Sequence, residues 1–349
     1  MDMKAIDGAE RLMMRMSERL PANEHRILVL GSFGFGNLGD EAILSMLLDD
    51  LAGRDLTVVS RDPDATRAMH GVRAVQAVSP ASGWAAWRAD ALVLGGGGVF
   101  SGLGGKLTKG LAYYMRGFQA IGKAIHFHAL GIYPDTDPAT LRILLPVLRK
   151  ARTLSVRDET SHTFLESLGI PSTQIPDPVT ALEPLGREAA VKALEAEGID
   201  AGRPWIGVSP RRVRKNQEHL ERELLGALRA LQARGHPILF LPTAHFPYGT
   251  YTNDLHFSRE LAAKLDPQLT GVVAGLHHPK LAAALFRIPR VHVPMRLHAM
   301  IFASRVGRPS TAIAYADKVA DVADELGIGH VSIPELNADD LVRRVEGLL

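Results

Sequence analysis

The sequence predicts an α/β protein of two Rossmann-like lobes, each built on a parallel sheet. Short apolar runs alternate with segments whose apolar residues recur at spacings of three and four, which indicates strands alternating with helices. The runs are continuously apolar, as in strands that are covered by helices on both faces. The pattern pauses near the middle of the 349-residue chain and then restarts, which favours two domains over one.

The first lobe is expected over residues 25–185, after a helical extension at 1–24. In the extension, Leu12, Met13, Met16 and Leu20 have helical spacing, which favours packing in a core or dimer over contact with a membrane surface. The lobe's predicted strands are Ile27–Leu30, Leu56–Val59, Ala91–Leu94, Ala124–His128 and Leu154–Val156. Its predicted helices are Glu41–Leu51, Lys106–Ile121, Pro138–Lys150 and Glu159–Leu168. This alternation favours right-handed crossovers between parallel strands.

The second lobe is expected over residues 186–349, with a hinge at 186–203 around one helix. Its predicted strands are Trp205–Val208, Ile238–Leu241, Gly271–Val273, Arg290–Val293 and Ser310–Ala314. Its predicted helices are Gln217–Ala233, Asp254–Leu265, His278–Phe286, His298–Val306 and Lys318–Leu326. A last helix, Ala338–Leu348, is expected to return to the first lobe.

The composition excludes several classes of protein. With 40 basic and 38 acidic residues the formal charge is +2, and only 6% of residues are aromatic, so a nucleic-acid partner is not expected. The absence of cysteine excludes disulfides, thiolate metal sites and a cysteine nucleophile. No run reaches the roughly 18 apolar residues of a membrane span, and the N-terminus does not resemble a signal peptide. A cytoplasmic protein is therefore expected.

In open parallel sheets ligands bind beyond the carboxyl ends of the strands. The first such segment is Gly31–Asp40, whose glycines would expose backbone N–H groups to an anion. Its spacing is not that of a dinucleotide fingerprint. Asp40 and Glu41 either cap the following helix or exchange protons, and the amide of Asn37 suits a sugar hydroxyl.

A run of four glycines, Gly95–Gly98, follows the strand predicted at 91–94. Such a run has a high conformational entropy cost, so either another segment of the backbone passes very close or a ligand lies against it. Of these two, a ligand in the cleft between the lobes is favoured.

Two cationic segments follow strands of the second lobe. Four cations lie within Arg211–Lys215, and Arg296 and His298 bracket a predicted strand-to-helix turn. Guanidinium groups suit a carboxylate or phosphate, and an imidazole titrates near neutrality. No set of His, Asp and Glu has metal-ligand spacing, so no metal is expected.

Taken together, these segments resemble the polysaccharide pyruvyl transferase family. The resemblance rests on seven stretches in order along the chain: Gly34–Ile43, Gly95–Gly98, Leu154–Asp158, Pro176–Pro178, Arg211, Arg296–Ala299 and Tyr315–Val319. One departure is that Val99, Phe100 and Ser101 follow the glycine run, where the family usually has an acidic residue.

The resemblance implies a GT-B-like fold with the active site between the lobes. It also implies transfer of the pyruvyl group of phosphoenolpyruvate to a saccharide as a ketal, in the biosynthesis of cell-surface polysaccharide or exopolysaccharide, without a cofactor. The implied donor-binding residues are Arg211, Arg296, Arg212 and Lys318, and the implied catalytic residues are His298, Asp40 and Glu41. The glycine-loop and acceptor residues would be Gly36, Asn37, Gly39, Gly95, Gly96, Gly97, Gly98 and Asp158.

Two other functions stay open at this point. Glycine turns and a basic second lobe would equally serve a GT-B glycosyltransferase that uses a nucleotide-sugar. A non-catalytic two-lobed sensor would bind the same anion without turnover. The acceptor is either free or lipid-linked, and peripheral contact with the inner face of the membrane and homo-oligomer formation are both left open.

Overall fold

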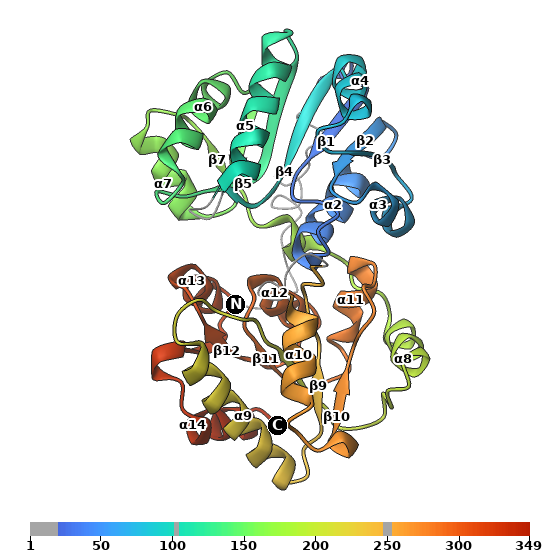
Figure 1. Ribbon diagram of the computed structural model, residues 1–349, viewed down its shortest axis with the longest axis vertical. Helices are drawn as coiled ribbons and strands as arrows, with labels where there is room; N and C mark the ends of the chain where they lie inside the picture. The colour runs from blue at the N-terminus through green and yellow to red at the C-terminus, as the bar shows by residue number, and fades with distance from the viewer. Residues whose placement is uncertain (1–19, 101–104, 247–252) are drawn as a thin grey trace. The chain divides into compact units, whose positions relative to one another are not determined.

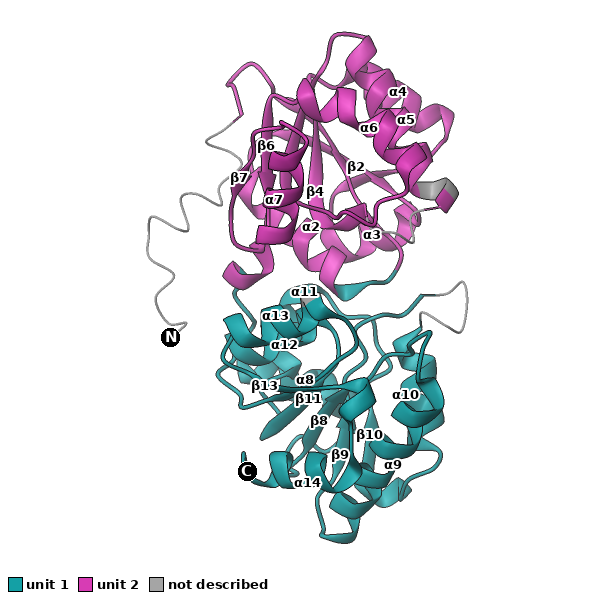
Figure 2. Cartoon of the chain, turned by 90° about the vertical axis from the view of Figure 1, so that its left-hand side faces the viewer, with its two compact units in different colours: residues 1–5, 36–38, 182–349 teal, residues 6–35, 39–181 magenta. Residues whose placement is uncertain are grey.

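The computed structural model describes residues 20–100, 105–246 and 253–349, so the predicted helix at the start of the chain lies outside the described residues. The chain divides into two compact units (Figure 2). The N-terminal unit contains the described residues up to Phe35 and Gly39–Ala181. The C-terminal unit contains Gly36–Leu38 and Leu182–Leu349, and so begins slightly before the expected hinge.

The N-terminal unit is built on a seven-stranded sheet in which all neighbouring strands are parallel. Its strand order is β3-β2-β1-β4-β5-β6-β7. The strands are β1 (Arg26–Leu30), β2 (Asp55–Ser60), β3 (Arg73–Gln76), β4 (Ala91–Phe100), β5 (Ala124–Ile132), β6 (Thr153–Val156) and β7 (Thr173–Gln174). The order of the strands reverses between β1 and β4, which is the point at which open α/β sheets bind ligands.

Helices connect these strands (Figure 1). They are α2 (Leu38–Asp50), α3 (Pro63–His70), α4 (Pro80–Arg88), α5 (Gly105–Ala120), α6 (Pro138–Arg149) and α7 (Glu159–Ser167), with a short 3-10 helix at Pro178–Ala181. Apolar residues of the sheet and of α5, α6 and α7 form one buried core, which includes Phe100, Phe127, Met115 and Leu144. Of these elements, β3, β7, α3 and α4 were not predicted.

The C-terminal unit repeats the scheme with a four-stranded parallel sheet in the order β10-β9-β8-β11. A parallel pair, β12 and β13, adjoins β11 through a bridge between His292 and Ser310. The strands are β8 (Ile206–Ser209), β9 (Ile238–Phe240), β10 (Thr270–Val272), β11 (Val291–Pro294), β12 (Thr311–Ala314) and β13 (Gly329–Ser332). Here the strand order reverses between β8 and β11.

The helices of this unit are α8 (Arg187–Ala196), α9 (Gln217–Ala233), α10 (Asp254–Ala262), α11 (Pro279–Leu285), α12 (Leu297–Arg305), α13 (Asp317–Glu325) and α14 (Ala338–Glu346), with 3-10 turns at Pro267–Leu269 and Ile333–Glu335. The expectation that the last helix packs on the first lobe is wrong. Leu341, Val342 and Val345 of α14 are buried in the core of the C-terminal unit, together with the leucines of α9. An ion pair from Arg234 to Glu346 holds the end of the helix there.

Candidate functional site

Arg211 and Arg296 lie at one edge of the C-terminal sheet. β8 and β11 are parallel neighbours, and their last paired residues are Ser209 and Pro294. Each arginine comes two residues after one of these partners, and the backbone N–H of Arg211 lies 3.3 Å from the sulfur of Met295. Burial, followed by the positive charge of Arg296, lowers the pKa of the Arg211 guanidinium. The structure therefore brings the two predicted arginines together at the point where the strand order reverses.

Asp254 orients Arg296. The guanidinium binds this carboxylate at two points, with Nη2 2.8 Å from Oδ1 and Nε 2.5 Å from Oδ2. The Asp254 side chain is almost completely buried at the start of α10, whereas that of Arg296 is partly exposed. Charged hydrogen bonds of this two-point kind fix both the position and the plane of a guanidinium. Asp254 was not predicted as a site residue, because the sequence around it indicates only the start of a helix.

Tyr315 orients Arg211. The central guanidinium carbon of Arg211 lies 4.0 Å from the centre of the Tyr315 ring, in a cation–π contact. Tyr315 directly follows β12 and is partly buried. Two guanidinium groups are thus held beside one carboxylate, which leaves the cluster of Arg211, Arg296 and Asp254 with a net positive charge. Such a cluster suits an anion.

Arg212 has a different environment from Arg211. Its guanidinium forms ion pairs with Glu221 of α9 and Glu260 of α10, and it lies 4.8 Å from the centre of the Phe257 ring. Because two carboxylates already balance its charge, we no longer assign Arg212 to donor binding. The side chain of Lys318 lies outside the described part of the structure.

His298 lies in the first turn of α12, two residues after Arg296, which is the residue that precedes the helix. Its side chain is partly buried. The local sequence explains this placement, since a strand that ends at Pro294 and a helix that starts at Leu297 leave only a tight turn between them. The catalytic role of His298 stays a prediction.

The segment Gly36–Leu38 pairs with the C-terminal unit. The Leu38 N–H donates to Thr243 O at 2.9 Å, and the His245 N–H donates to Gly36 O at 2.8 Å. Asn37 and Ala244 form the antiparallel bridge between these bonds. Gly36 has a φ of +74°, and a Cβ there would lie 2.9 Å from a carbonyl oxygen. The glycine is therefore needed for this pairing, and these backbone groups of residues 36 and 38 bind the protein itself.

Glu41 is buried at the start of α2. One carboxylate oxygen accepts the N–H of Gly34 at 2.8 Å, and the other lies 2.9 Å from Nε2 of His70. Both side chains are nearly inaccessible to solvent. Glu41 thus anchors the glycine turn to α3. Asp40 is the more accessible of the two predicted carboxylates, and Gly39 is buried beside it.

The glycine run Gly95–Gly98 is part of a strand rather than a turn, because β4 continues to Phe100 and pairs with β5. A Cβ at Gly96 would lie 2.7 Å from the carbonyl oxygen of Ala129. At Gly97, where φ is +92°, a Cβ would lie 2.9 Å from a carboxylate oxygen of Asp40. Close packing within the protein therefore accounts for Gly96 and Gly97. The expectation that a ligand lies against the whole run is wrong for these two positions.

Gly98 borders a polar cluster in the same unit. A Cβ there would make only ordinary contacts, at 3.6 Å from Nη2 of Arg157 and 3.7 Å from the ring of Tyr133. Arg157 is buried and pairs with Asp177 at 2.9 Å, while the Tyr133 hydroxyl donates to Asp158 at 2.8 Å. Burial raises the pKa of Tyr133. Of this cluster, Asp158 alone was predicted as a site residue from the sequence, and it also caps α7.

Over residues 20–100, 105–246 and 253–349, no group of three or more His, Asp or Glu side chains is placed to hold a metal ion.

Known structures share this fold. HepE (Alr3699) from Anabaena, in its complex with UDP-glucose, has a TM-score of 0.62 at 12% identity, over 93% of this chain and 89% of that one. UDP-GlcNAc 2-epimerase from Methanocaldococcus jannaschii has a TM-score of 0.60 at 11% identity, over 93% of this chain and 92% of that one. The chain is therefore an α/β protein of two Rossmann-like lobes with a GT-B-like fold.

The sequence was also compared with known families and with curated proteins. The curated proteins gave no significant match. A family profile described as polysaccharide pyruvyl transferase matches residues 37–317. This range covers most of the chain and contains Asn37, Arg211, Arg296 and His298. The chain belongs to the polysaccharide pyruvyl transferase family.

Proposed function

We propose that this protein transfers the pyruvyl group of phosphoenolpyruvate to a saccharide and forms a pyruvate ketal. The observation that supports the proposal most is the pair Arg211 and Arg296 at the β8–β11 edge, where Asp254 pairs with Arg296 and the positive charge of Arg296 acts on the buried Arg211 guanidinium. Phosphoenolpyruvate carries a phosphate and a carboxylate on neighbouring positions. Two planar cations with fixed orientations can bind such a ligand at both ends.

The two arginines differ in which guanidinium N–H groups are already bound within the protein. Asp254 takes Nε and Nη2 of Arg296, which sets the plane of its guanidinium. The Tyr315 ring lies against one face of the Arg211 guanidinium, and Nε of Arg211 donates to the backbone carbonyl of Arg212 at 3.4 Å, so Nη1 and Nη2 are the nitrogens proposed to bind the ligand. The Arg211 and Arg296 side chains are both partly buried, so water screens their charges less than it would at an open surface.

In the proposed reaction, His298 gives a proton to the methylene carbon of phosphoenolpyruvate, which becomes the methyl group and leaves cationic character on the neighbouring carbon. One sugar hydroxyl adds to that carbon and loses its proton to a base. The C–O bond to phosphate breaks, the second hydroxyl adds, and the ketal forms with release of inorganic phosphate. Of the two hydroxyl protons, one replaces the proton given to carbon and one leaves with phosphate.

We assign the acceptor to the polar cluster of Arg157, Tyr133 and Asp158 beside Gly98. Hydroxyl and carboxylate groups at a strand end suit the hydroxyls of a sugar, free or lipid-linked. Glu41 is proposed to hold the glycine turn rather than to exchange protons, because both its oxygens are engaged and buried. The role of Asp40 as a second proton acceptor stays a prediction.

The test is a screen for phosphate release from phosphoenolpyruvate with β-mannoside, galactoside and glucoside acceptors. Acceptor-dependent phosphate release with a new ketal in the product supports the proposal. Binding of phosphoenolpyruvate without turnover on any acceptor would instead indicate a sensor. Tighter binding of UDP than of phosphoenolpyruvate would indicate a glycosyltransferase that uses a nucleotide-sugar.

A further inference from the structure

The exposed face of α4 carries two tryptophans that the rest of the described chain leaves uncovered. Trp84 and Trp87 are 60% and 63% exposed. Their rings stack, with centroids 5.0 Å apart and an interplanar angle of 25°. Large apolar side chains that gather at the surface are typical of an interaction site, because contact with a partner would remove their apolar area from water.

Helix α5 lies beside α4 and extends this surface. The Tyr114 hydroxyl donates to the carbonyl of Ser82 in α4 at 3.0 Å, and Lys123, just after α5, donates to the carbonyl of Trp87 at 3.0 Å. Tyr113 and Ile121 are 58% and 54% exposed. We refer to Trp84, Trp87, Arg88, Tyr113, Arg116, Ile121 and Lys123 as the α4–α5 surface.

This part of the chain is nearly free of negative charge. Acidic residues make up 38 of the 349 residues of the chain, yet Asp90 is the one acidic residue between Ala65 and Pro134. Its carboxylate is bound by Arg26. The basic residues in the same stretch are Arg67, Arg73, Arg88, Lys106, Lys109, Arg116 and Lys123. The α4–α5 surface thus combines apolar side chains with cations and has no anion of its own.

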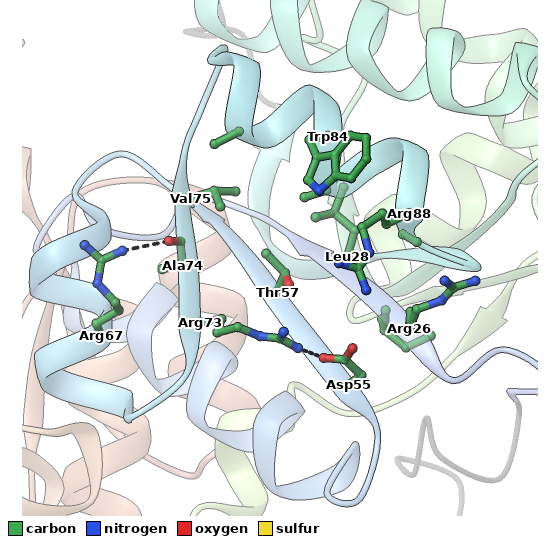
Figure 3. Close-up of a pocket in the computed structure, with 14 residues that line it drawn as sticks. Arg26, Leu28, Asp55, Thr57, Arg67, Arg73, Ala74, Val75, Trp84 and Arg88 are labelled. Atoms are coloured by element: carbon green, nitrogen blue, oxygen red, sulfur yellow. Dashed lines mark hydrogen bonds and ion pairs between the residues drawn. The ribbon is translucent and has the colours of Figure 1, made fainter.

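A pocket of about 300 Å³ opens at one flank of α4 (Figure 3). Trp84 and Arg88 line it from the helix, and residues at the amino-terminal ends of β1, β2 and β3 line it from the sheet. Arg73 in the pocket pairs with Asp55. Arg88 has no carboxylate partner among the residues that the structure describes. It can therefore accept an anion from outside.

These features favour a lipid surface over a sugar polymer or a protein. Indole rings prefer the headgroup level of a bilayer, where one edge is polar and the rest apolar. Exposed aliphatic side chains such as Ile121, and Val78 just before α4 with 93% exposure, add nothing to sugar stacking but insert favourably among lipids. Cations without neighbouring anions are attracted to the acidic lipids of a membrane surface. Within the described residues, no helix is long and apolar enough to cross a membrane, so contact would be peripheral.

We propose that the α4–α5 surface docks the protein on a membrane that contains anionic lipids, with the α4 pocket accepting a phosphate headgroup at Arg88. The pocket lies at the amino-terminal ends of β1, β2 and β3, whereas the glycine segments lie at the carboxyl ends of β1 and β4. Docking is therefore independent of the chemistry proposed above, and it would place the enzyme where a lipid-linked acceptor is found.

The experiment measures the full-length protein with vesicles of phosphatidylcholine alone and with about a third phosphatidylglycerol. The chain has three tryptophans, and the third, Trp205, is buried, so a change in tryptophan emission reports mainly on Trp84 and Trp87. We expect a blue shift and co-sedimentation with the anionic vesicles, both weakened by salt, and little binding to the neutral ones. No binding to anionic vesicles at low salt overturns the proposal.

Two variants locate the surface. We expect vesicle binding to be at least about tenfold weaker in each of two double variants, Trp84→Ala/Trp87→Ala and Arg88→Glu/Arg116→Glu. The matched control Arg222→Glu, on the exposed face of α9, should bind as the wild type does. Far-ultraviolet circular dichroism and melting temperature should be unchanged, since all the replaced side chains are exposed.

Two further measurements test whether a second copy of the protein or a polysaccharide, rather than a membrane, binds the α4–α5 surface. Loss of a wild-type dimer in the tryptophan variant, by analytical ultracentrifugation, would show a self-association surface and overturn the proposal. Tighter binding to soluble alginate than to vesicles would show a polysaccharide site and also overturn it. Because vesicle binding needs no substrate, a failure of phosphoenolpyruvate turnover leaves this result unaffected.

Discussion

Asp254 and Arg296 form a two-point ion pair whose carboxylate is buried, with one guanidinium nitrogen 2.8 Å and the other 2.5 Å from the two carboxylate oxygens. The carboxylate comes from the first residue of α10 and the guanidinium from the residue before α12. The backbone N–H of Asp254 also donates to Ala244 O at 2.8 Å, and Ala244 is the bridge partner of Asn37. A chain of contacts thus leads from the glycine segment to the proposed donor site.

Asp254→Asn tests this pair. The amide keeps the shape but loses the charge, so the free energy of unfolding should fall by up to about 3 kcal/mol, the lower end of the cost of breaking a buried pair, because Arg296 is partly exposed. The KM for phosphoenolpyruvate should rise because Arg296 loses its fixed orientation. Urea denaturation and steady-state kinetics provide the two measurements. Asp340→Asn is the control, since its exposed pair with Arg344 should be worth under about 1 kcal/mol.

Lysine at Arg211 or Arg296 keeps the charge but removes the planar fork. We expect each change to weaken the use of phosphoenolpyruvate by about 1.5–3 kcal/mol in kcat/KM. Arg222→Lys, on the exposed side of α9, should have little effect. Equal kinetics for all three variants would mean that the donor binds elsewhere.

His298→Ala should lower turnover by roughly 10²–10⁴-fold if this imidazole is the general acid. The affinity for phosphoenolpyruvate, measured by equilibrium binding, should change much less than turnover. His256→Ala is the matched control, because His256 is an exposed helical histidine that pairs with Glu260. Near-normal turnover in His298→Ala would exclude the assigned role.

Alanine substitutions in the glycine run separate packing from ligand binding. Gly97→Ala should destabilise the fold by about 1 kcal/mol or more, because its left-handed backbone and the nearby Asp40 carboxylate exclude a methyl group. Gly98→Ala should leave the melting temperature unchanged, since only ordinary contacts surround its Cβ. If the acceptor binds beside Gly98, this second variant should raise the KM for the saccharide alone. Unchanged acceptor kinetics would place the saccharide elsewhere.

The stability of the C-terminal unit should depend on the protonation of His292. Burial lowers the pKa of this histidine from 6.5 to about 4. Because the folded pKa is depressed, the unfolded chain binds more protons between these values, and stability falls as the pH drops from 6.5 to 4. The slope contributed by this group is at most about 1.4 kcal/mol per pH unit. Urea unfolding from pH 7.5 to 4 measures it, and His292→Gln should lose this slope.

The repeated strand and helix pattern of both lobes could be predicted because it rests on continuous apolar runs. The short elements β3, α3 and α4 could not, since β3 and α3 hold few apolar residues, the tryptophans of α4 are exposed, and both helices depend on caps at Asp62 and Ser79. The β4 strand was predicted to end at Leu94 because glycine is a weak strand former. Pairing with β5 carries the strand through the glycine run to Phe100.

Part of the candidate site could be predicted because its arginines follow strands that the sequence reveals. Arg211 and Arg296 follow strands, and the parallel register brings strand ends together. Asp254 and Tyr315 orient these arginines from other elements, so only tertiary structure reveals them. The pairing of Arg212 with Glu221 and Glu260 likewise depends on how α9 and α10 pack.

The assignment of Gly36–Leu38 to the C-terminal unit has a practical consequence for dissecting the protein. A fragment that starts at Leu182 would include almost all of that unit but would lack these three residues. The carbonyl of Thr243 and the N–H of His245 would then lose their backbone partners. Cutting the chain at one place therefore cannot separate the two units cleanly. A fragment for crystallography or isotope labelling would need residues 36–38 supplied as a fused linker or an added peptide.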